Sequence, residues 1–333
     1  MIRQSYKEGD VFLLFQELPY DFHSGKLPIV ILENLYFDYT PSELLDPERF
    51  YSPNDVKDLL EHAGLVNMVL PGHTLPGIGI TNCCFRFDSA KTNQYPDFKP
   101  SRLFATFIVS LRLQKPCPIR IGGKFTVGPN NEPIQNPELW YLTSPHNPKP
   151  RLSYSKKDIQ LSSEMYKELL EILQYDNKNR IKSALIYFSQ VTQGFSKSLQ
   201  LSYLGLWSAL EALFQPSGSN KAKTIARRIA TYLSSFHPRD ELEAWCLREY
   251  RNRRSKFTHG SHVAPPSLQN VIRGKSAFPK LHEATRLCLL GFLSLKKSEQ
   301  IQISQQTGKQ LQRKLDELGQ AKGRYLSQQK MYL

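Results

Sequence analysis

The chain has 333 residues, of which 40% are hydrophobic and 22% are charged. This composition excludes a disordered chain or a simple coiled coil, and the length is sufficient for two domains with separate cores. The 44 Lys and Arg residues outnumber the 30 Asp and Glu residues and give a formal net charge of +14. Such a surplus favours polyanionic partners, with nucleic acid first and anionic membrane surfaces second.

The sequence carries no sign of a targeting segment or a metal site. The N-terminal decapeptide MIRQSYKEGD lacks the apolar core of a signal peptide, and the longest strongly apolar run, 287–295, is too short to span a bilayer. We therefore expect a cytoplasmic protein without membrane contact. The five scattered cysteines have no CxxC spacing, which argues against a disulfide framework and a zinc site. We expect neither a metal ion nor a cofactor.

Up to about residue 150, short β-branched or aromatic runs alternate with Pro, Gly and Asn. Runs bounded by such turn residues predict strands, and six of them qualify: VFLLFQEL, PIVILENLYF, GIGITNCCFRF, LFATFIVSLRL, PIRIGGKFTV and ELWYL. Segment 53–63 predicts a helix, because Val56, Leu59 and Leu60 share one helical face. Residues 1–150 are thus expected to form a β-rich domain that senses or binds a partner.

The polar, proline-rich stretch 144–153 predicts a domain boundary. Beyond it the periodicity becomes helical, over residues 159–175, 180–196, 199–214, 221–236, 239–258 and 279–297, and short connections predict a bundle over 151–298. Residues 299–333 predict a polar, basic helix or tail. The expected fold class is α+β, a β-rich N-terminal domain followed by an all-α helical bundle.

The decapeptide RNRRSKFTHG, residues 251–260, ends the helix expected over 239–258. Gly260 suits the left-handed position after a helix, which places His259 near the C-terminus. The helix carbonyls favour a protonated histidine and the neighbouring cations disfavour it, so His259 is expected to titrate near neutral pH. Arg254 lies five residues earlier, about 140° away in an ideal helix. The two meet at one phosphate only if the last turn unwinds or a second protomer supplies the other group.

Tyr250, Arg254, Ser255, His259 and Gly260 form the pattern Y-x-x-x-R-S-x-x-x-H-G, and LGLWSALEALF followed by KAKTIARRIATYL lies upstream. This combination resembles the HEPN superfamily, whose RxxxxH motif lies in a helical bundle, and is most similar to the ApeA-like HEPN proteins of prokaryotes. The resemblance covers about residues 155–297.

The resemblance implies a function. Many catalytic HEPN proteins are metal-independent endoribonucleases that act as dimers, with the two RxxxxH motifs facing each other. Here it implies that Arg254 and His259 of each protomer form one composite active site, supported by Ser255. It also implies a role in prokaryotic anti-phage defence by abortive infection, with a phage-derived trigger or a regulatory partner acting on the N-terminal domain.

Two other functions stay open. In the first, the same bundle is a non-catalytic HEPN dimer that binds RNA or a protein partner. In the second, the chain is a regulatory or scaffold protein whose basic surplus serves only solubility and proximity to DNA. Residue types agree with cleavage, because metal-independent hydrolysis of RNA needs a base, an acid and cations around the phosphate.

Further residues are candidates for supporting roles. Glu211 lies on the apolar stripe of helix 199–214, where a carboxylate needs an arginine partner, and the candidates are Arg227, Arg228 and Arg254. The pair would be structural, or would orient the motif arginine, and Tyr250 would support the site. An RNA-binding rim is predicted from the surrounding cations, with a solvated helix face as the alternative: Arg251, Arg253, Lys256, Arg227 and Arg228.

Overall fold

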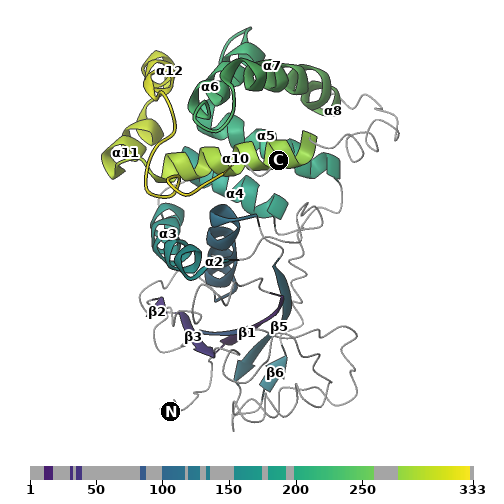
Figure 1. Cartoon of the computed structure of the whole chain (residues 1–333), viewed down its shortest axis with the longest axis vertical. Helices are drawn as coiled ribbons and strands as arrows, with labels where there is room; N and C mark the ends of the chain where they lie inside the picture. The colour runs from purple at the N-terminus through teal and green to yellow at the C-terminus, as the bar shows by residue number, and fades with distance from the viewer. Residues whose placement is uncertain are drawn as a thin grey trace. The chain divides into compact units, whose positions relative to one another are not determined.

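A computed structural model of the whole chain describes residues 11–17, 31–32, 35–39, 83–87, 100–116, 119–127, 133–135, 154–174, 179–192, 199–258 and 277–330. The strands are described by their backbone alone, and side chains are described from Arg102 onward within the later ranges. The chain divides into two compact units, Met1–Lys167 and Glu168–Leu333 (Figure 1). The division falls inside a helix, later than the proline-rich stretch that the sequence favoured.

The first unit contains a six-stranded sheet in the order β2-β3-β4-β1-β5-β6, with all neighbours antiparallel. The strands are β1 (Val11–Glu17), β2 (Ile31–Leu32), β3 (Leu35–Tyr39), β4 (Cys83–Phe87), β5 (Arg120–Val127) and β6 (Pro133–Gln135). The central strand β1 pairs with β4 on one side and β5 on the other, and its register with β5 shifts twice after Leu14. Each strand falls within or beside a run of β-branched and aromatic residues, except β6.

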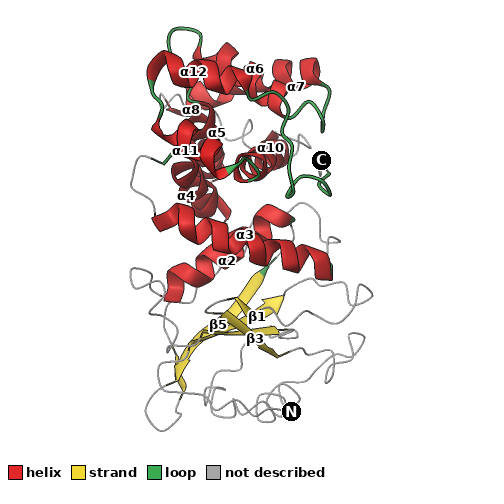
Figure 2. Ribbon diagram, turned by 90° about the vertical axis from the view of Figure 1, so that its left-hand side faces the viewer, coloured by secondary structure: helices red, strands yellow, loops and turns green. Residues whose placement is uncertain are grey.

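Two long helices belong to the same part of the chain, α2 (Pro100–Gln114) and α3 (Lys156–Gln174). Both lie on one side of the sheet in Figures 1 and 2. Phe107 of α2 meets Tyr166 of α3 edge to face, with ring centroids 5.7 Å apart. Tyr154 fastens the end of α2, because its hydroxyl donates to the carbonyls of Leu111 and Lys115.

The predicted fold class, with its β-rich N-terminal domain, is wrong. Where the structure describes side chains as well as backbone, every regular element is a helix. The run 103–113, predicted as a strand, forms most of α2, in which all residues from Thr106 to Gln114 are buried. A helix buried on all sides shows no amphipathic period, so its sequence resembles that of a buried strand. The helix predicted over 53–63 lies outside the described residues.

The second unit is a helical bundle. Its helices begin with α4 (Arg180–Thr192), α5 (Leu199–Phe214), α6 (Lys221–Tyr232) and α7 (Arg239–Glu249), which continues through η6 (Tyr250–Arg254) into α8 (Ser255–Thr258). They end with α10 (Ala277–Leu293), α11 (Lys297–Gln305) and α12 (Gly308–Glu317). Helix α4 packs on α5, α6 on α7, and α10 on both α4 and α5. The bounds predicted for α5, 199–214, are confirmed. Its apolar stripe faces the core.

Helix α10 runs through the centre of the bundle, and every residue from Glu283 to Leu293 is buried. Phe292 packs against Phe214 of α5 and Tyr232 of α6, with ring centroids 5.4 and 5.3 Å away. The helix also buries the ion pair of Glu283 and Arg286, whose Nη1 donates to Gln329 Oε1 at 2.8 Å. A buried charge pair of this kind needs such additional polar partners.

The C-terminal segment is part of the bundle rather than a loose tail. Leu311, Leu315 and Tyr325 are buried, and the backbone N–H of Ala321 donates to the carbonyl of Tyr232 at 2.7 Å. Arg228 of α6 joins this segment to α5 through the carbonyls of Gln312 and Phe214. Among the helices that the structure describes, none has the length and apolar character that crossing a membrane demands.

Candidate functional site

The helix that carries the RxxxxH pattern contains a π-helical turn. Helix α7 starts after Pro238, with Asp240 and Glu241 in its first turn, where negative charge complements the helix dipole. The turn η6 then widens, so that the backbone N–H of Ser255 donates to the carbonyl of Tyr250, five residues earlier. Short π-helical turns inside α-helices frequently mark functional sites. The continuous α-helix predicted over 239–258 therefore has one interruption, placed at the motif arginine.

Arg254 is held by a carboxylate from another helix. Its Nη2 donates to Oε2 of Glu211 at 3.0 Å, and its Nε lies 2.8 Å from Oε1. The two side chains are only about a quarter exposed, at 26% for Arg254 and 25% for Glu211. Of the three arginines expected as partners of Glu211, the structure pairs Arg254 with it. One hydrogen bond and a second close charge contact orient the guanidinium as well as neutralising it.

The ring of Tyr250 also contacts the guanidinium of Arg254. The guanidinium carbon of Arg254 lies 5.2 Å from the centroid of the Tyr250 ring, within the range of a cation–π contact. The ring itself packs edge to face on Trp207 of α5, 5.2 Å away. Burial, together with the nearby Glu211 carboxylate, raises the pKa of Tyr250 to about 12. The phenol is therefore neutral near pH 7 and remains a hydrogen-bond donor.

A second polar cluster lies one residue before the π-helical turn. Glu249 is 4% exposed and accepts hydrogen bonds on Oε2 from the Tyr203 hydroxyl at 2.9 Å and from Arg253 Nη1 at 2.7 Å. Burial, with the Glu249 charge, raises the pKa of Tyr203. The Tyr203 ring meets Phe257 edge to face at 5.7 Å, so this cluster joins α5 to both sides of the turn.

The sequence did not single out Glu249 or Tyr203. The spacing of Glu249 and Arg253 at i and i+4 was a readable signal, since such pairs face each other on a helix. Its importance depends on burial, which the spacing alone does not reveal.

The five predicted RNA-binding cations have different surroundings. Arg251 and Lys256 are exposed, and so is Arg248 nearby. The Arg253 guanidinium is bound to Glu249, and the half-exposed Arg227 donates to Asp316 Oδ1 at 2.9 Å.

Arg228 was predicted to belong to the RNA-binding rim, and its burial contradicts that prediction. Its side chain is buried, and its guanidinium donates to the carbonyl of Phe214 at 2.6 Å, to Asp316 Oδ1 at 2.9 Å and to the carbonyl of Gln312 at 3.1 Å. These contacts cap the C-terminus of α5 and anchor α12. The residue is structural and has no surface to offer RNA.

Of the predicted pair, the structure describes Arg254 but not His259. The described residues stop at Thr258 and resume at Ala277. Thr258 Oγ1 donates to the carbonyl of Arg254 at 2.9 Å, so the helix runs to the residue before the histidine. Ser255 is half-buried, and its backbone N–H makes the hydrogen bond that defines the π-helical turn.

Within the part of the chain that the structure describes, no three His, Cys, Asp or Glu side chains lie close enough to hold a metal ion. The described thiols, Cys246 and Cys288, are both buried, and burial raises the pKa of each. The described groups around Arg254 thus comprise a guanidinium paired with Glu211, a neutral phenol beside it and exposed positive charge. The exposed cations suit the approach of a phosphate.

Comparisons with known proteins give no relative: no family model, no curated protein and no solved structure matches the chain. The resemblance to HEPN proteins consequently stays a prediction from the sequence motif.

Proposed function

We propose that the chain is a metal-independent endoribonuclease of HEPN type, whose active site is completed by a second copy of the chain. The observation that carries the proposal is the fixed guanidinium of Arg254. Glu211 and Tyr250 hold it at a π-helical turn that ends five residues before His259. Exposed cations on the same helix, Arg248, Arg251 and Lys256, support the approach of a nucleic-acid backbone.

In the proposed reaction, His259 of one protomer accepts the proton of a ribose 2′-OH, and the 2′-oxygen forms a bond to phosphorus. The bond from phosphorus to the 5′-oxygen breaks, and the imidazolium of His259 from the other protomer gives that oxygen a proton. The two Arg254 side chains stabilise the charge on the phosphorane. The products carry a 2′,3′-cyclic phosphate and a 5′-hydroxyl.

The paired state of Arg254 also favours a second candidate. A guanidinium already bound to a carboxylate is suited to a structural or binding role, in which the bundle holds RNA without cutting it. This is the non-catalytic HEPN dimer that the sequence left open.

One experiment separates the two functions. Purified wild-type protein and the variants His259→Ala and Arg254→Ala are each incubated with total RNA in EDTA. The ends of the RNA fragments are then mapped. The enzyme gives 2′,3′-cyclic phosphate ends with wild type only. Identical fragment profiles for wild type and His259→Ala, with RNA retained on the protein, would establish binding without cleavage.

The composite site has its own test. When a fixed amount of wild type is mixed with a large excess of His259→Ala and allowed to exchange subunits, cleavage per wild-type chain should fall steeply. Each mixed dimer contains only one of the two required histidines. Unchanged activity in the mixture would mean that one chain supplies the whole site.

A further inference from the structure

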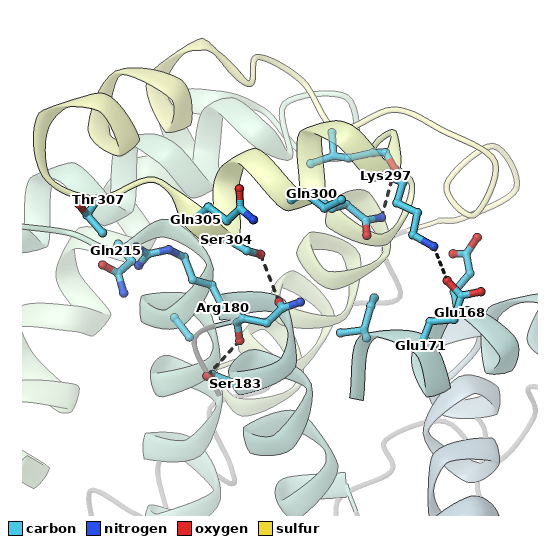
Figure 3. Close-up of a pocket in the computed structure, with 15 residues that line it drawn as sticks. Glu168, Glu171, Arg180, Ser183, Gln215, Lys297, Gln300, Ser304, Gln305 and Thr307 are labelled. Atoms are coloured by element: carbon cyan, nitrogen blue, oxygen red, sulfur yellow. Dashed lines mark hydrogen bonds and ion pairs between the residues drawn. The ribbon is translucent and has the colours of Figure 1, made fainter. Parts of the chain in front are cut away.

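Helices α4, α5 and α11 of the second unit surround a cavity of about 760 Å³ that does not include the Arg254 site. The end of α3 and the residues Leu295 and Thr307 complete its wall. Small-molecule sites typically occupy a few hundred to about 1,000 Å³. Figure 3 shows the polar side chains that line this cavity, which is large enough for an organic ligand.

Arg180 is a cation in the cavity wall that is held by backbone carbonyls and not by a carboxylate. Its Nε donates to the carbonyl of Ile303 at 3.2 Å, and its Nη2 donates to the carbonyl of Gln306 at 2.9 Å. These carbonyls lie at the C-terminal end of α11, and a helix end carries only about half an elementary charge. The guanidinium therefore keeps net positive charge, and three of its five N–H donors remain for another partner.

Buried or half-buried arginines elsewhere in the bundle have carboxylate partners. Arg228, Arg254 and Arg286 lie 2.9, 2.8 and 3.0 Å from carboxylate oxygens of other residues. Burial lowers the pKa of Arg180, because its surroundings disfavour the charged form. Arg180 is also the first residue of α4, the helix end at which the dipole disfavours a cation. An anion beside Arg180 would offset both effects.

The two carboxylates of the cavity wall do not supply that anion. Glu168 and Glu171 lie at the end of the cavity opposite Arg180 (Figure 3). Each also has a cation of its own, because Glu171 Oε2 lies 2.7 Å from Lys297 Nζ and Glu168 Oε1 pairs with Arg324 Nη2. The counter-charge of Arg180 is therefore left to a ligand.

Gln215 and Thr307 lie at the same end of the cavity as Arg180 (Figure 3), and both side chains carry hydrogen-bond donors. Gln215 follows the last residue of α5 with φ of 38°, a left-handed conformation that glycine usually takes there. Strained backbone of this kind often persists at ligand sites. This end thus combines a guanidinium with further donors, which suits a carboxylate, since a carboxylate only accepts hydrogen bonds.

Four apolar side chains also line the cavity: Ile172, Ala212, Leu295 and Ile301. Ile301 is 41% exposed, so it offers apolar surface that a ligand can cover. We propose that this cavity binds an organic monocarboxylate with an apolar body. The carboxylate accepts N–H bonds from Arg180, and the apolar body covers Ile301 and its apolar neighbours. This inference does not depend on ribonuclease activity.

The test uses 4-phenylbutyrate as the probe and its neutral amide, 4-phenylbutyramide, as the matched control. Isothermal titration calorimetry on the full chain should show saturable binding of 4-phenylbutyrate. The amide has the same apolar body but no negative charge to meet Arg180. It should therefore bind at least about tenfold more weakly, the loss expected for a hydrogen bond to a charged group.

Two arginine variants test the charge. Arg180→Met should weaken the binding of 4-phenylbutyrate at least about tenfold and leave the binding of the amide nearly unchanged, so that the preference for the acid disappears. Arg313→Met is the control, because Arg313 lies on α12 outside the cavity and should keep the preference. Circular dichroism and thermal melts establish that each variant is folded.

Two isoleucine variants test the place of binding without altering Arg180. Ile301→Trp puts a bulky ring beside the cavity and should abolish binding of 4-phenylbutyrate. Ile186→Trp alters a residue of α4 that is equally exposed, at 40%, but does not line the cavity, and binding should persist.

Four outcomes would overturn the inference. They are the absence of saturable binding by 4-phenylbutyrate, equal binding of the acid and the amide, a preference for the acid that survives Arg180→Met, and binding that survives Ile301→Trp. The matched phosphate ester, 4-phenylbutyl phosphate, is titrated in parallel. Tighter binding of this more highly charged anion would contradict a monocarboxylate as the occupant.

Discussion

Arg254 and Glu211, 43 positions apart in the chain, form a two-point ion pair in which Nη2 donates to Oε2 at 3.0 Å and Nε lies 2.8 Å from Oε1. The pair links the π-helical turn η6 to helix α5. It therefore fixes the direction of the motif arginine from outside its own helix.

Arg254→Lys should reduce RNA cleavage at least about tenfold, because an ammonium cannot reproduce the fork that meets both a carboxylate and a phosphate. The loss in the free energy of unfolding should stay near 1 kcal/mol, since the pair is partly exposed. Arg313→Lys is the control, because Arg313 also pairs with a carboxylate, Glu317, and belongs to no part of the predicted site. Equal losses of cleavage in the two variants would contradict a special role for Arg254.

Glu249→Ala should lower the free energy of unfolding by about 3 kcal/mol, because it leaves the buried Tyr203 hydroxyl and Arg253 without their shared acceptor. Tyr203→Phe should cost about 1 kcal/mol. The double variant should cost less than the sum, which urea denaturation measures as a coupling. Strictly additive effects would show that the cluster does not act as a unit.

Arg228→Met should destabilise the protein by about 3 kcal/mol and expose the C-terminal segment to hydrogen exchange, because three anchoring contacts disappear together. Arg227→Met, at the neighbouring exposed position, should cost no more than about 0.5 kcal/mol. Amide protection in residues 308–326 provides the direct measurement. Unchanged protection in Arg228→Met would mean that Leu311, Leu315 and Tyr325 hold the segment without the arginine.

Gly291→Ala should destabilise the bundle by about 2 kcal/mol, because an added Cβ would lie 2.6 Å from Tyr232 Oη and 2.7 Å from Cε1. Tyr232→Phe removes that oxygen, which is buried and has no hydrogen-bond partner among the described residues. The single variant Tyr232→Phe should be nearly neutral, and the double variant should recover part of the loss. Thermal melts of the four proteins test this, and absence of any recovery would place the clash elsewhere.

Asp158 should make the free energy of unfolding of the first unit depend on pH in the acid range. Burial raises the pKa of this carboxyl, but hydrogen bonds from Lys115 and Ser155 outweigh burial and hold the pKa below its usual value of 3.8. The stabilisation is therefore complete above about pH 4 and is lost as the pH falls through the lower folded value. Asp158→Asn should cost about 2 kcal/mol at pH 7, with the difference from wild type shrinking in acid. A difference independent of pH would exclude the charge as its source.

The sequence predicted the bundle better than the first unit, and the physical reason is amphipathicity. Helix α5 alternates buried and half-buried positions at helical spacing, and its bounds were predicted correctly. Helix α2 buries even Arg112 and Gln114, so its sequence carries no polar face to reveal a helical period. The β-branched residues of α2 then favoured the wrong prediction of a strand.

The candidate site was predictable in part. The apolar surroundings of Glu211 predicted an arginine partner, but three arginines satisfied the pattern, and choosing Arg254 required the tertiary structure. Arg228 appeared equal to Arg227 in sequence, although one is buried and the other half-exposed. The π-helical turn had no sequence signature, because Tyr250 to Arg254 contains no residue that breaks a helix.

A π-helical turn accommodates one more residue than an α-helical turn. Removal of Asn252, an exposed position, would restore regular α-helical winding and leave the residues after it close to their present orientation relative to α7. Tyr250 and Phe257 would then both still face α5, where each now contacts an aromatic ring. The wide turn therefore changes the path of the backbone over Tyr250–Arg254 without changing which residues on either side of it face the core.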